Sequence, residues 1–233
     1  MESNERNRIV DAALELGEQQ SWEAVRLHAV AAAAGTSLDK ERLYFREKED
    51  LVDAWFDRAD SAMLQESEAP DFQVLSPRKR LHRLIMTWLA TLAPHRNVTR
   101  QMIYGKMELG HVHIQIPGLM RISRTVQWIR EAAHLDATYA RRALEETGLT
   151  SIYLMTFFYW MKDNTPSSER TSCFLDWLLG TTERLDQLLC GSVCSFTAKE
   201  TTSTMPTKQT GSTQPKKLAK KKVETALRHY CED

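Results

Sequence analysis

LHAVAAAAGTSLDKERLYFREKEDL, residues 27–51, carries the pattern from which the architecture of this chain follows. Its first eight residues are dominated by alanine, the strongest helix former, and predict a short helix from Leu27 to about Ala34. Gly35 then stops that helix, where a left-handed backbone is easiest for glycine. Ser37 is a suitable N-cap for another short helix that ends near Tyr44. The stretch therefore predicts two short helices joined by a tight turn.

Upstream, apolar side chains recur at intervals of three and four residues and predict a supporting helix, which Gly17 ends or loosens. These side chains are Ile9, Ala12, Ala13 and Leu16. Two short helices joined by a glycine turn, packed on a preceding helix, are typical of a helix-turn-helix motif, whose second helix enters the major groove of DNA. The residues expected to meet DNA are Ser37, Lys40, Arg42, Tyr44 and Lys48.

The rest of the chain also has helical spacing, and no alternating strand pattern of convincing length interrupts it. Further helices are predicted at 48–66, from Ser76–Pro77 to Pro94, at 98–107, from Pro117 after a loop at 108–117, at 136–162 and at 169–189. The chain is expected to be all-α, with a helix-turn-helix domain at 1–50 and a second helical domain at 51–190. A disordered linker at 191–215 and a basic amphipathic tail at 216–233 follow.

The N-terminal pattern resembles a known family. AVAAAAGTS at 29–37, the Tyr44–Phe45 pair and KEDL at 48–51 are similar to the N-terminal domain of the TetR family of transcriptional regulators, over roughly residues 5–60. The resemblance implies a three-helix DNA-binding domain followed by an all-helical domain that binds a small ligand and forms a homodimer. It also implies that operator DNA is a partner. The sequence shows no glycine-rich phosphate loop, nucleophile elbow or Ser/His/Asp order, so an enzyme is not expected.

The chain departs from that family within the predicted DNA-reading helix. Asp39 and Lys40 replace a small Gly-Thr step, and Glu41 and Arg42 replace a Leu-Tyr pair. Arg42 could still contact phosphate through its charge, whereas Asp39 and Glu41 are expected to repel the DNA backbone. Residues 1–50 hold 7 Lys and Arg against 11 Asp and Glu, so the domain alone is expected to bind DNA weakly. A helix-turn-helix kept only as a scaffold is the alternative interpretation.

The second half is rich in large apolar side chains, which suit a cavity for an apolar effector between helices of a bundle. The predicted ligand-binding residues are Met86, Trp88, Met102, Met107, Trp128, Phe157 and Trp160. The alternative is that they simply form the core. The two last long helices are expected to pair with those of a second copy, and the candidate contacts are Thr156, Phe157, Trp160, Trp177 and Leu178.

A second resemblance lies in this half. YARRALEETGLTSIYLMTFFYWMKDNTPSS at 139–168 and FLDWLL at 174–179 are similar to the lipid-binding accessory proteins of coenzyme Q (ubiquinone) biosynthesis, which share the TetR fold. It implies an alternative function, in which the helix-turn-helix is degenerate and the ligand is an isoprenoid lipid. The basic tail KKLAKKKVETALRHY at 216–230 would then lie on an anionic membrane surface. DNA phosphates and plain solvent are the other candidates for its surroundings.

Composition excludes several classes of protein. The chain has 233 residues with 31 Lys and Arg against 31 Asp and Glu, no apolar run long enough to span a membrane and no apolar leader. Its four cysteines are too few for a disulfide framework, so a cytoplasmic protein is expected, peripheral to the inner face of the membrane under the lipid alternative. His111 and His113 lack partners for a metal site, and no cofactor or catalytic motif is expected.

Overall fold

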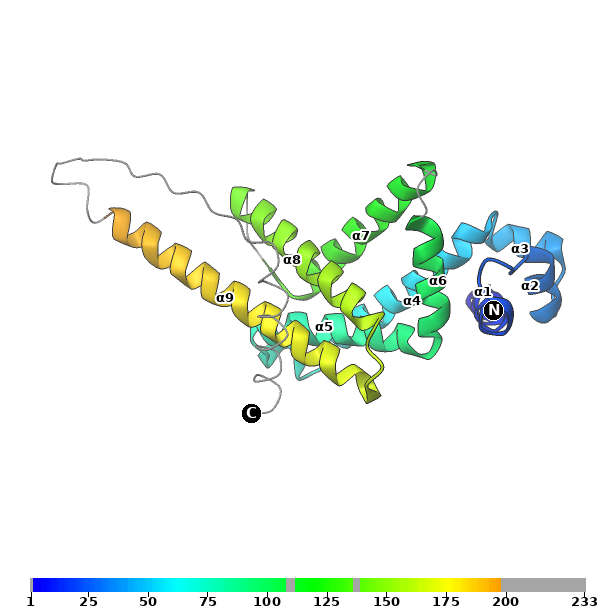
Figure 1. Ribbon diagram of the computed structural model, residues 1–233, viewed down its shortest axis with the longest axis horizontal. Coiled ribbons are helices and arrows are strands. Elements are labelled where there is room, and N and C mark those ends of the chain that lie inside the picture. The colour runs from blue at the N-terminus through cyan, green and yellow to red at the C-terminus, as the bar shows by residue number, and fades with distance from the viewer. Residues whose placement is uncertain (1, 108–111, 136–138, 198–233) are drawn as a thin grey trace, which may run out of the picture. The chain divides into compact units, whose positions relative to one another are not determined.

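The computed structural model describes the backbone of residues 2–107, 112–135 and 139–197, and side chains within 4–105, 121–135 and 142–184. Every regular element in these ranges is helical, as predicted (Figure 1). The α-helices are α1 Glu2–Gln20, α2 Leu27–Ala33, α3 Leu38–Tyr44, α4 Lys48–Ser67, α5 Pro77–Leu92, α6 Arg96–Met107, α7 Val112–Ala132, α8 Tyr139–Trp160 and α9 Glu169–Thr197. Three short 3-10 helices are η1 Phe72–Val74, η2 Ala93–His95 and η3 Pro166–Ser168.

Helix starts follow the capping residues in the sequence. The Ser37 side chain accepts a hydrogen bond from the backbone N–H of Lys40 at 3.3 Å and begins α3. Ser76 caps α5 in the same way. Pro77 follows in the first turn, where its missing N–H costs nothing because an N–H there would have no acceptor within the helix. These local signals explain why the predicted starts of α3 and α5 are confirmed.

Three predicted boundaries are wrong. Helix α1 runs through Gly17 to Gln20, because a small residue here serves close packing rather than termination. Helix α7 begins at Val112, so Pro117 falls near its start instead of at its first position. Helix α9 continues to Thr197, into the predicted linker, because Val193 and Phe196 extend the apolar helical spacing. The remainder of the linker and the basic tail lie outside the described residues.

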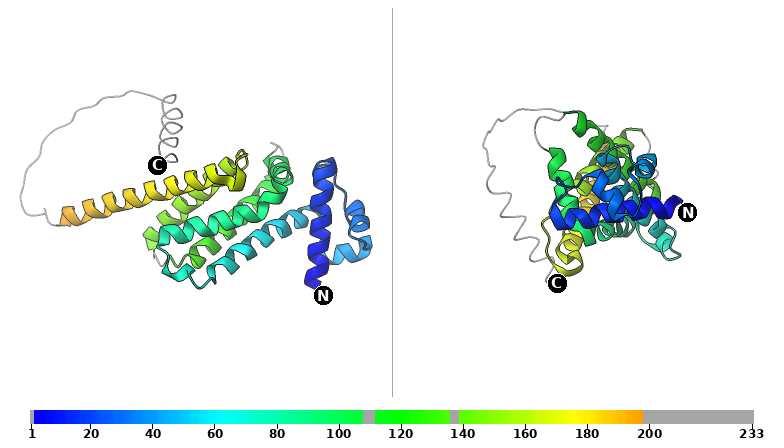
Figure 2. Two further views of the ribbon diagram at one scale, coloured as in Figure 1. Left: turned by 90° about the horizontal axis from the view of Figure 1, so that it is seen from below. Right: turned by 90° about the vertical axis from the view of Figure 1, so that its right-hand side faces the viewer.

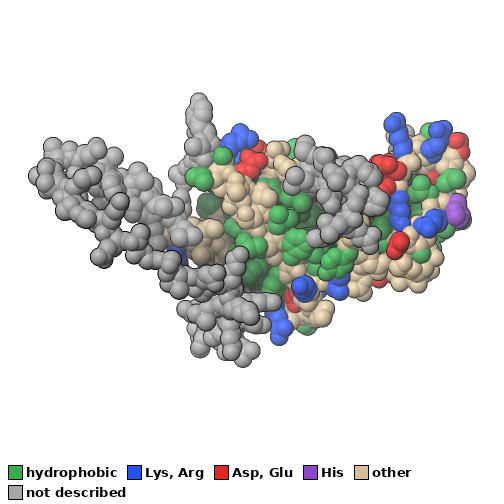
Figure 3. Space-filling view, turned by 45° about the horizontal axis from the view of Figure 1, so that its top comes forward, with side chains coloured by type: hydrophobic (Ala, Val, Ile, Leu, Met, Phe, Trp, Pro, Cys, Tyr) green, Lys and Arg blue, Asp and Glu red, His purple; other side chains and the backbone are tan. Residues whose placement is uncertain are grey.

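The chain divides into two compact units, Met1–Lys162 and Asp163–Asp233. In the first unit, α1 to α3 form a small head, and α4 to α8 form a helical body in which α4 and α5 pack along each other most extensively (Figure 2). The face drawn in Figure 3 shows apolar side chains gathered in the middle and mixed charges towards the head. Arg80 of α5 links the segment before α5 to the end of α7. Its guanidinium donates to the carbonyls of Leu75, Gln73 and Ala133.

The second unit begins with a buried carboxylate. Asp163 accepts hydrogen bonds from the backbone N–H and hydroxyl of Thr165 and from those of Thr171. Burial raises the pKa of Asp163, but these four donors outweigh it, so the pKa lies below its ordinary value. Asp163 therefore holds the turn that precedes α9.

Two further properties bear on the predicted surroundings of the protein. Within the described ranges, no helix has both the length and the apolar character needed to cross a bilayer. Cys173 is disulfide-bonded, although the cysteines were expected to be too few for a disulfide framework.

Candidate nucleic-acid interface and effector core

The turn between α2 and α3 sets the direction of α3. Gly35 has a φ of +64°, a left-handed conformation that glycine adopts without steric cost. The N–H of Thr36 donates to the carbonyl of Ala31 at 2.9 Å, and that of Gly35 donates to Ala32 at 3.1 Å. These two bonds form a Schellman motif, which satisfies carbonyls at the end of α2. The glycine predicted to stop α2 therefore also aims α3.

Helix α3 presents two cations to solvent. Lys40 and Arg42 are both exposed, as the DNA-binding prediction requires. Arg42 lies 3.8 Å from the carboxylate of Asp39, one turn earlier, and both side chains are largely exposed. An exposed pair of this kind contributes at most about 1 kcal/mol, so a DNA phosphate or base could displace Asp39 from Arg42.

Two residues predicted to meet DNA are engaged inside the head instead. The ammonium of Lys48 donates to the carbonyls of Trp22 and Glu23 and lies 4.9 Å from the centre of the Trp22 ring. Desolvation, the first of several causes, lowers its pKa. The hydroxyl of Tyr44 lies 3.4 Å from a carboxylate oxygen of Glu5 in α1. Lys48 and Tyr44 therefore hold the loop after α1 and the end of α3 in place, and Ser37 caps α3.

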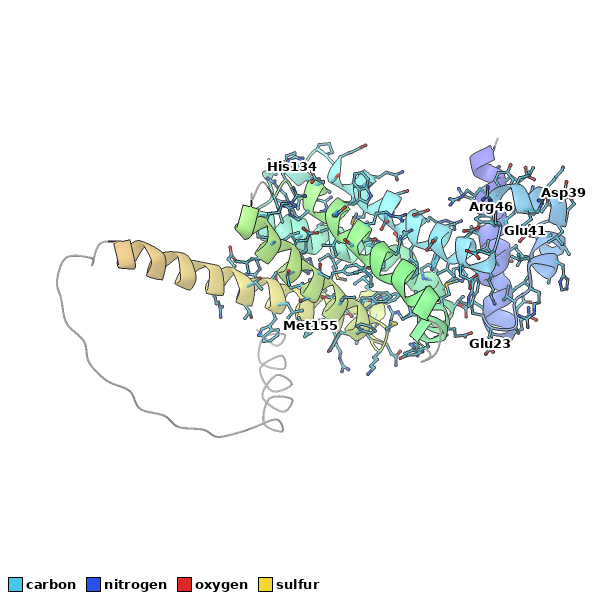
Figure 4. The ribbon with its side chains drawn as sticks, turned by 90° about the horizontal axis from the view of Figure 1, so that it is seen from above. Glu23, Asp39, Glu41, Arg46, His134 and Met155 are labelled. Carbon is cyan, nitrogen blue, oxygen red and sulfur yellow. The ribbon has the colours of Figure 1, made fainter. Side chains whose placement is uncertain are left out.

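Glu41 does not face DNA, contrary to the prediction. Its side chain is 1% exposed, and neither carboxylate oxygen has a hydrogen-bond partner among the described residues. Desolvation raises its pKa, because an apolar environment disfavours the charged form. In Figure 4, Asp39 lies at the outer edge of the head and Glu41 further in. The predicted repulsion of the DNA backbone therefore cannot come from Glu41.

The excess of acidic residues in the head is partly used in contacts. The Asp11 carboxylate lies 2.6 Å from the guanidinium of Arg58 in α4. The Asp50 side chain accepts from the backbone N–H of Arg46 at 2.7 Å and forms a capping box at the start of α4. These carboxylates fasten the head to α4, so the charge count alone overstates the repulsion of DNA.

The head also contacts α6 of the body. The N–H of Trp22 donates to the side chain of Gln101 at 2.6 Å. Gly17 in α1 allows the approach, because a Cβ there would lie 2.9 Å from a methyl carbon of Val98. Trp55 of α4 donates through its indole N–H to the hydroxyl of Thr99 at 2.9 Å. Helix α6 is therefore held against both α1 and α4.

An aromatic cluster forms the centre of the body. Trp88 stacks on Phe56 with ring centres 5.8 Å apart, and its edge meets Tyr153 and Phe157 at 5.3 and 5.7 Å. Trp160 in turn stacks on Phe157 at 5.8 Å. The structure thus brings together three of the predicted ligand-binding residues, packed on each other as a core.

The other predicted ligand-binding residues are dispersed. Met102 is buried and Met86 partly buried. Trp128 of α7 is 46% exposed, so it lies on the surface and does not belong to the aromatic cluster's interior. The side chain of Met107 lies outside the described ones.

A polar network that the prediction missed crosses this apolar core. The carboxylate of Asp60 in α4 is 6% exposed and accepts from the indole N–H of Trp88 at 2.8 Å and from Thr125 at 3.0 Å. Arg121 of α7 donates to Asp60 at 2.9 Å, to Asp57 at 2.5 Å and to the carbonyl of Asp53 at 3.1 Å. Arg121 therefore links α7 to two successive turns of α4.

Burial raises the pKa of Asp60, while Arg121, Trp88 and Thr125 act in the opposite direction. Burial also raises the pKa of the neighbouring Tyr153 hydroxyl, which therefore stays protonated. One feature of the sequence could have predicted this network. Three aspartates at helical spacing, Asp53, Asp57 and Asp60, indicate a side of α4 that binds a cationic side chain.

The surface of α8 differs from the predicted dimer contacts. Thr156, Phe157 and Trp160 are buried within this chain, so they cannot meet a second copy. Among the described side chains of α8, the large apolar ones that are exposed are Leu144, Met155 and Phe158, which lie on the opposite side of the helix. In α9, Leu178 is buried and Trp177 partly so. The predicted contacts on α8 therefore lie on its buried side, and the side that α8 exposes is a different one.

No group of His, Cys, Asp and Glu suited to a metal ion occurs among the residues that were described, and His111 and His113 fall outside the described side chains.

Comparison with solved structures gives clear matches. A TetR transcriptional regulator from Nitrosomonas europaea ATCC 19718 is 56% identical, covering 76% of this chain and 96% of that chain, with a TM-score of 0.68. A TetR transcriptional regulator from Rhodococcus sp. RHA1 (19% identity; 77% and 98% covered) and a TetR-family regulator from Streptomyces coelicolor (19%; 97% and 97%) each have a TM-score of 0.55 and share the fold. A scan against family models and a search of curated proteins gave no match.

In the three-helix head, the capped helix α3 carries exposed cations, and the head is joined to a helical body. This arrangement is typical of helix-turn-helix regulators of transcription. The high identity over nearly the whole of the Nitrosomonas protein makes the assignment specific. The chain belongs to the TetR family of transcriptional regulators.

Proposed function

We propose that this protein binds operator DNA through α2 and α3 and releases or retains it in response to an apolar effector. The observation that carries the proposal is the exposed pair Lys40 and Arg42 on a helix held in place by the Gly35 turn and the Ser37 cap. The division into a DNA-binding part at 1–50 and an effector-binding and dimerisation part at 51–190 belongs to this proposal.

The roles of the head residues differ. Lys40 and Arg42 contact the DNA, since both are exposed and Arg42 is held only by the weak pair with Asp39. Ser37, Tyr44 and Lys48 are positioning residues, because their polar groups cap or brace elements of the head. This division supports a head that is preorganised for the major groove.

The effector is proposed to enter the aromatic cluster around Trp88. Aromatic walls with a few polar groups are typical of small-molecule sites in helical bundles, and Asp60 and Thr125 supply such groups here. An apolar molecule with one hydroxyl fits this chemistry. It would separate the packed rings and act on the neighbouring Arg121.

Contacts lead from Arg121 to the head. Asp57 of α4 receives Arg121 on one oxygen and lies 3.5 Å from Arg6 of α1 on the other. The guanidinium of Arg6 lies 5.6 Å from the centre of the Phe45 ring, directly after α3. An effector that binds better when Arg121 has moved would favour a second arrangement of α4 and the head.

A homodimer completes the proposal. The exposed side of α8 combines Leu144, Met155 and Phe158 with the small residues Gly148 and Ser151, which permit close approach of a second helix. Dimerisation would place two α3 helices about 34–36 Å apart, one turn of DNA.

The proposal is tested by selecting duplexes from random sequence with the full chain and measuring affinity over a salt series. Arg42→Ala should weaken binding and flatten the salt dependence by about one phosphate contact. Arg124→Ala, an exposed arginine on α7, is the matched control and should bind like the wild type. Failure to enrich any sequence would overturn the proposal.

The effector part is tested with 1-naphthol and decanol, apolar alcohols that represent the proposed chemistry. Binding should quench the fluorescence of the buried Trp88 and Trp160, raise the melting temperature and change DNA affinity. If neither alcohol changes any of the three, the proposed effector chemistry is wrong.

The accessory function in coenzyme Q biosynthesis stays a prediction. None of the similarities reported above concerns such a protein, and the basic tail that would meet a membrane lies outside the described residues. No specific observation therefore favours it.

A further inference from the structure

Helix α3 exposes an apolar side chain where charge would be expected. Leu43 is 75% exposed, and Leu38 of the same short helix is also exposed. Large apolar side chains on a DNA-facing helix gain nothing from phosphates, which attract cations and hydrogen-bond donors. We therefore expect Leu43 to contact an apolar group, unlike Lys40 and Arg42, which are suited to phosphates.

The position of Leu43 on the helix is outward. Glu41 is the buried residue of α3 and marks the side that faces the rest of the head. At about 100° per residue, Leu43 lies about 160° around the helix from Glu41, as does Asp39. These two side chains form the outermost line of α3, and Arg42 lies beside them.

That outermost line has the character of a base-reading surface. When a helix enters the major groove, its outer side reaches the base edges, while flanking side chains reach the two backbones. Among the base edges, only thymine presents a methyl group, and apolar side chains contact it.

We propose that Leu43 is a specificity-determining residue of this regulator and that it contacts the 5-methyl group of a thymine in the operator. This inference rests on the proposed function, because it assigns a base contact to the same helix. The proposed partner of Leu43 is DNA. The experiment distinguishes this from a contact with another protein.

Replacement of thymine by deoxyuridine removes only the methyl group and is the direct test. Each thymine of a duplex selected with the full chain is replaced in turn, and the Kd is measured by fluorescence anisotropy. Wild-type protein should bind about fourfold more weakly when the contacted methyl is removed, the effect of burying one carbon. Leu43→Ala should bind thymine and deoxyuridine duplexes equally.

Val74→Ala is the matched control, because Val74 is 84% exposed and lies in η1, outside the head. It should keep the sensitivity of the wild type to deoxyuridine. The helical circular dichroism of both variants should be unchanged, since neither side chain is buried.

The outcomes separate the two proposals. If no duplex is enriched, the proposed DNA binding fails and the thymine contact with it. If a duplex is enriched but no thymine is sensitive, or if Leu43→Ala keeps the sensitivity, only the assignment of Leu43 is overturned. A change of oligomeric state in Leu43→Ala with unaltered base preference would assign the leucine to a protein contact and also overturn it.

Discussion

Replacing Arg121 by methionine tests the clamp between α7 and α4. The change keeps an apolar side chain of similar length but removes the donor to Asp60, whose carboxylate is almost fully buried. Breaking a buried ion pair by removing one partner costs about 3–5 kcal/mol, because the other charge stays uncompensated. That is a large part of the stability of a domain, about 5–15 kcal/mol.

The loss should depend on pH in a defined direction. Burial already raises the pKa of Asp60, and removal of Arg121 takes away the largest opposing influence, so the pKa rises further. A carboxyl with a raised folded-state pKa binds its proton more tightly in the folded protein. The variant should therefore be least impaired below the ordinary pKa of 3.8 and lose stability as the pH rises through the folded-state pKa.

Urea denaturation followed by circular dichroism from pH 3.5 to 8 measures both effects. Arg124→Met, on the exposed side of the same helix, should stay within about 0.5 kcal/mol of the wild type. Adding Asp60→Asn to Arg121→Met should recover much of the loss and remove its pH dependence, since the amide oxygen still accepts from Trp88. A cost below about 1 kcal/mol, or one independent of pH, would refute a buried charge clamp.

Three further changes probe other parts of the chain. Glu41→Leu should stabilise the protein by about 1–3 kcal/mol at pH 7, because an unpartnered buried carboxylate is removed. Since its folded-state pKa is raised, the gain should shrink as the pH falls towards 4.5, and a gain that persists in acid would contradict this origin. Gly17→Ala should lower the melting temperature, because overpacking against Val98 costs about 1–3 kcal/mol and exceeds the helix-propensity gain of about 1. Gly105→Ala, with no atom near its Cβ, should raise the melting temperature, and equal shifts would count against the close packing. Asp163→Ala should destabilise the protein by about 0.5–2 kcal/mol, as the loss of a capping residue does. Because the folded-state pKa of Asp163 is lowered, its contribution to stability is present above pH 3.8 and disappears as the pH falls through the lowered value. If the variant is equally destabilised in acid, the charged carboxylate is not the cause.

Local signals along the chain were sufficient to predict α2 and α3 of the head. The alanine run, Gly35 and the Ser37 cap predict α2, the turn and α3, because helix propensity, left-handed backbone and capping all act within a few residues. The all-α class also follows from the sequence, since the apolar spacing repeats almost throughout. The exposed Lys40 and Arg42 belong to this predictable part, being polar residues on a short helix.

Contacts between distant helices determined the rest. Glu41 looks like a surface residue in sequence, yet packing of the head buries it. The partner of Asp60 lies 61 residues away in α7, and no local pattern indicates which of several arginines it is. Lys48 likewise finds carbonyls 25 and 26 residues earlier. Helical periodicity records that a face is apolar, but which polar groups are enclosed depends on how the helices meet, and that is a property of the whole fold.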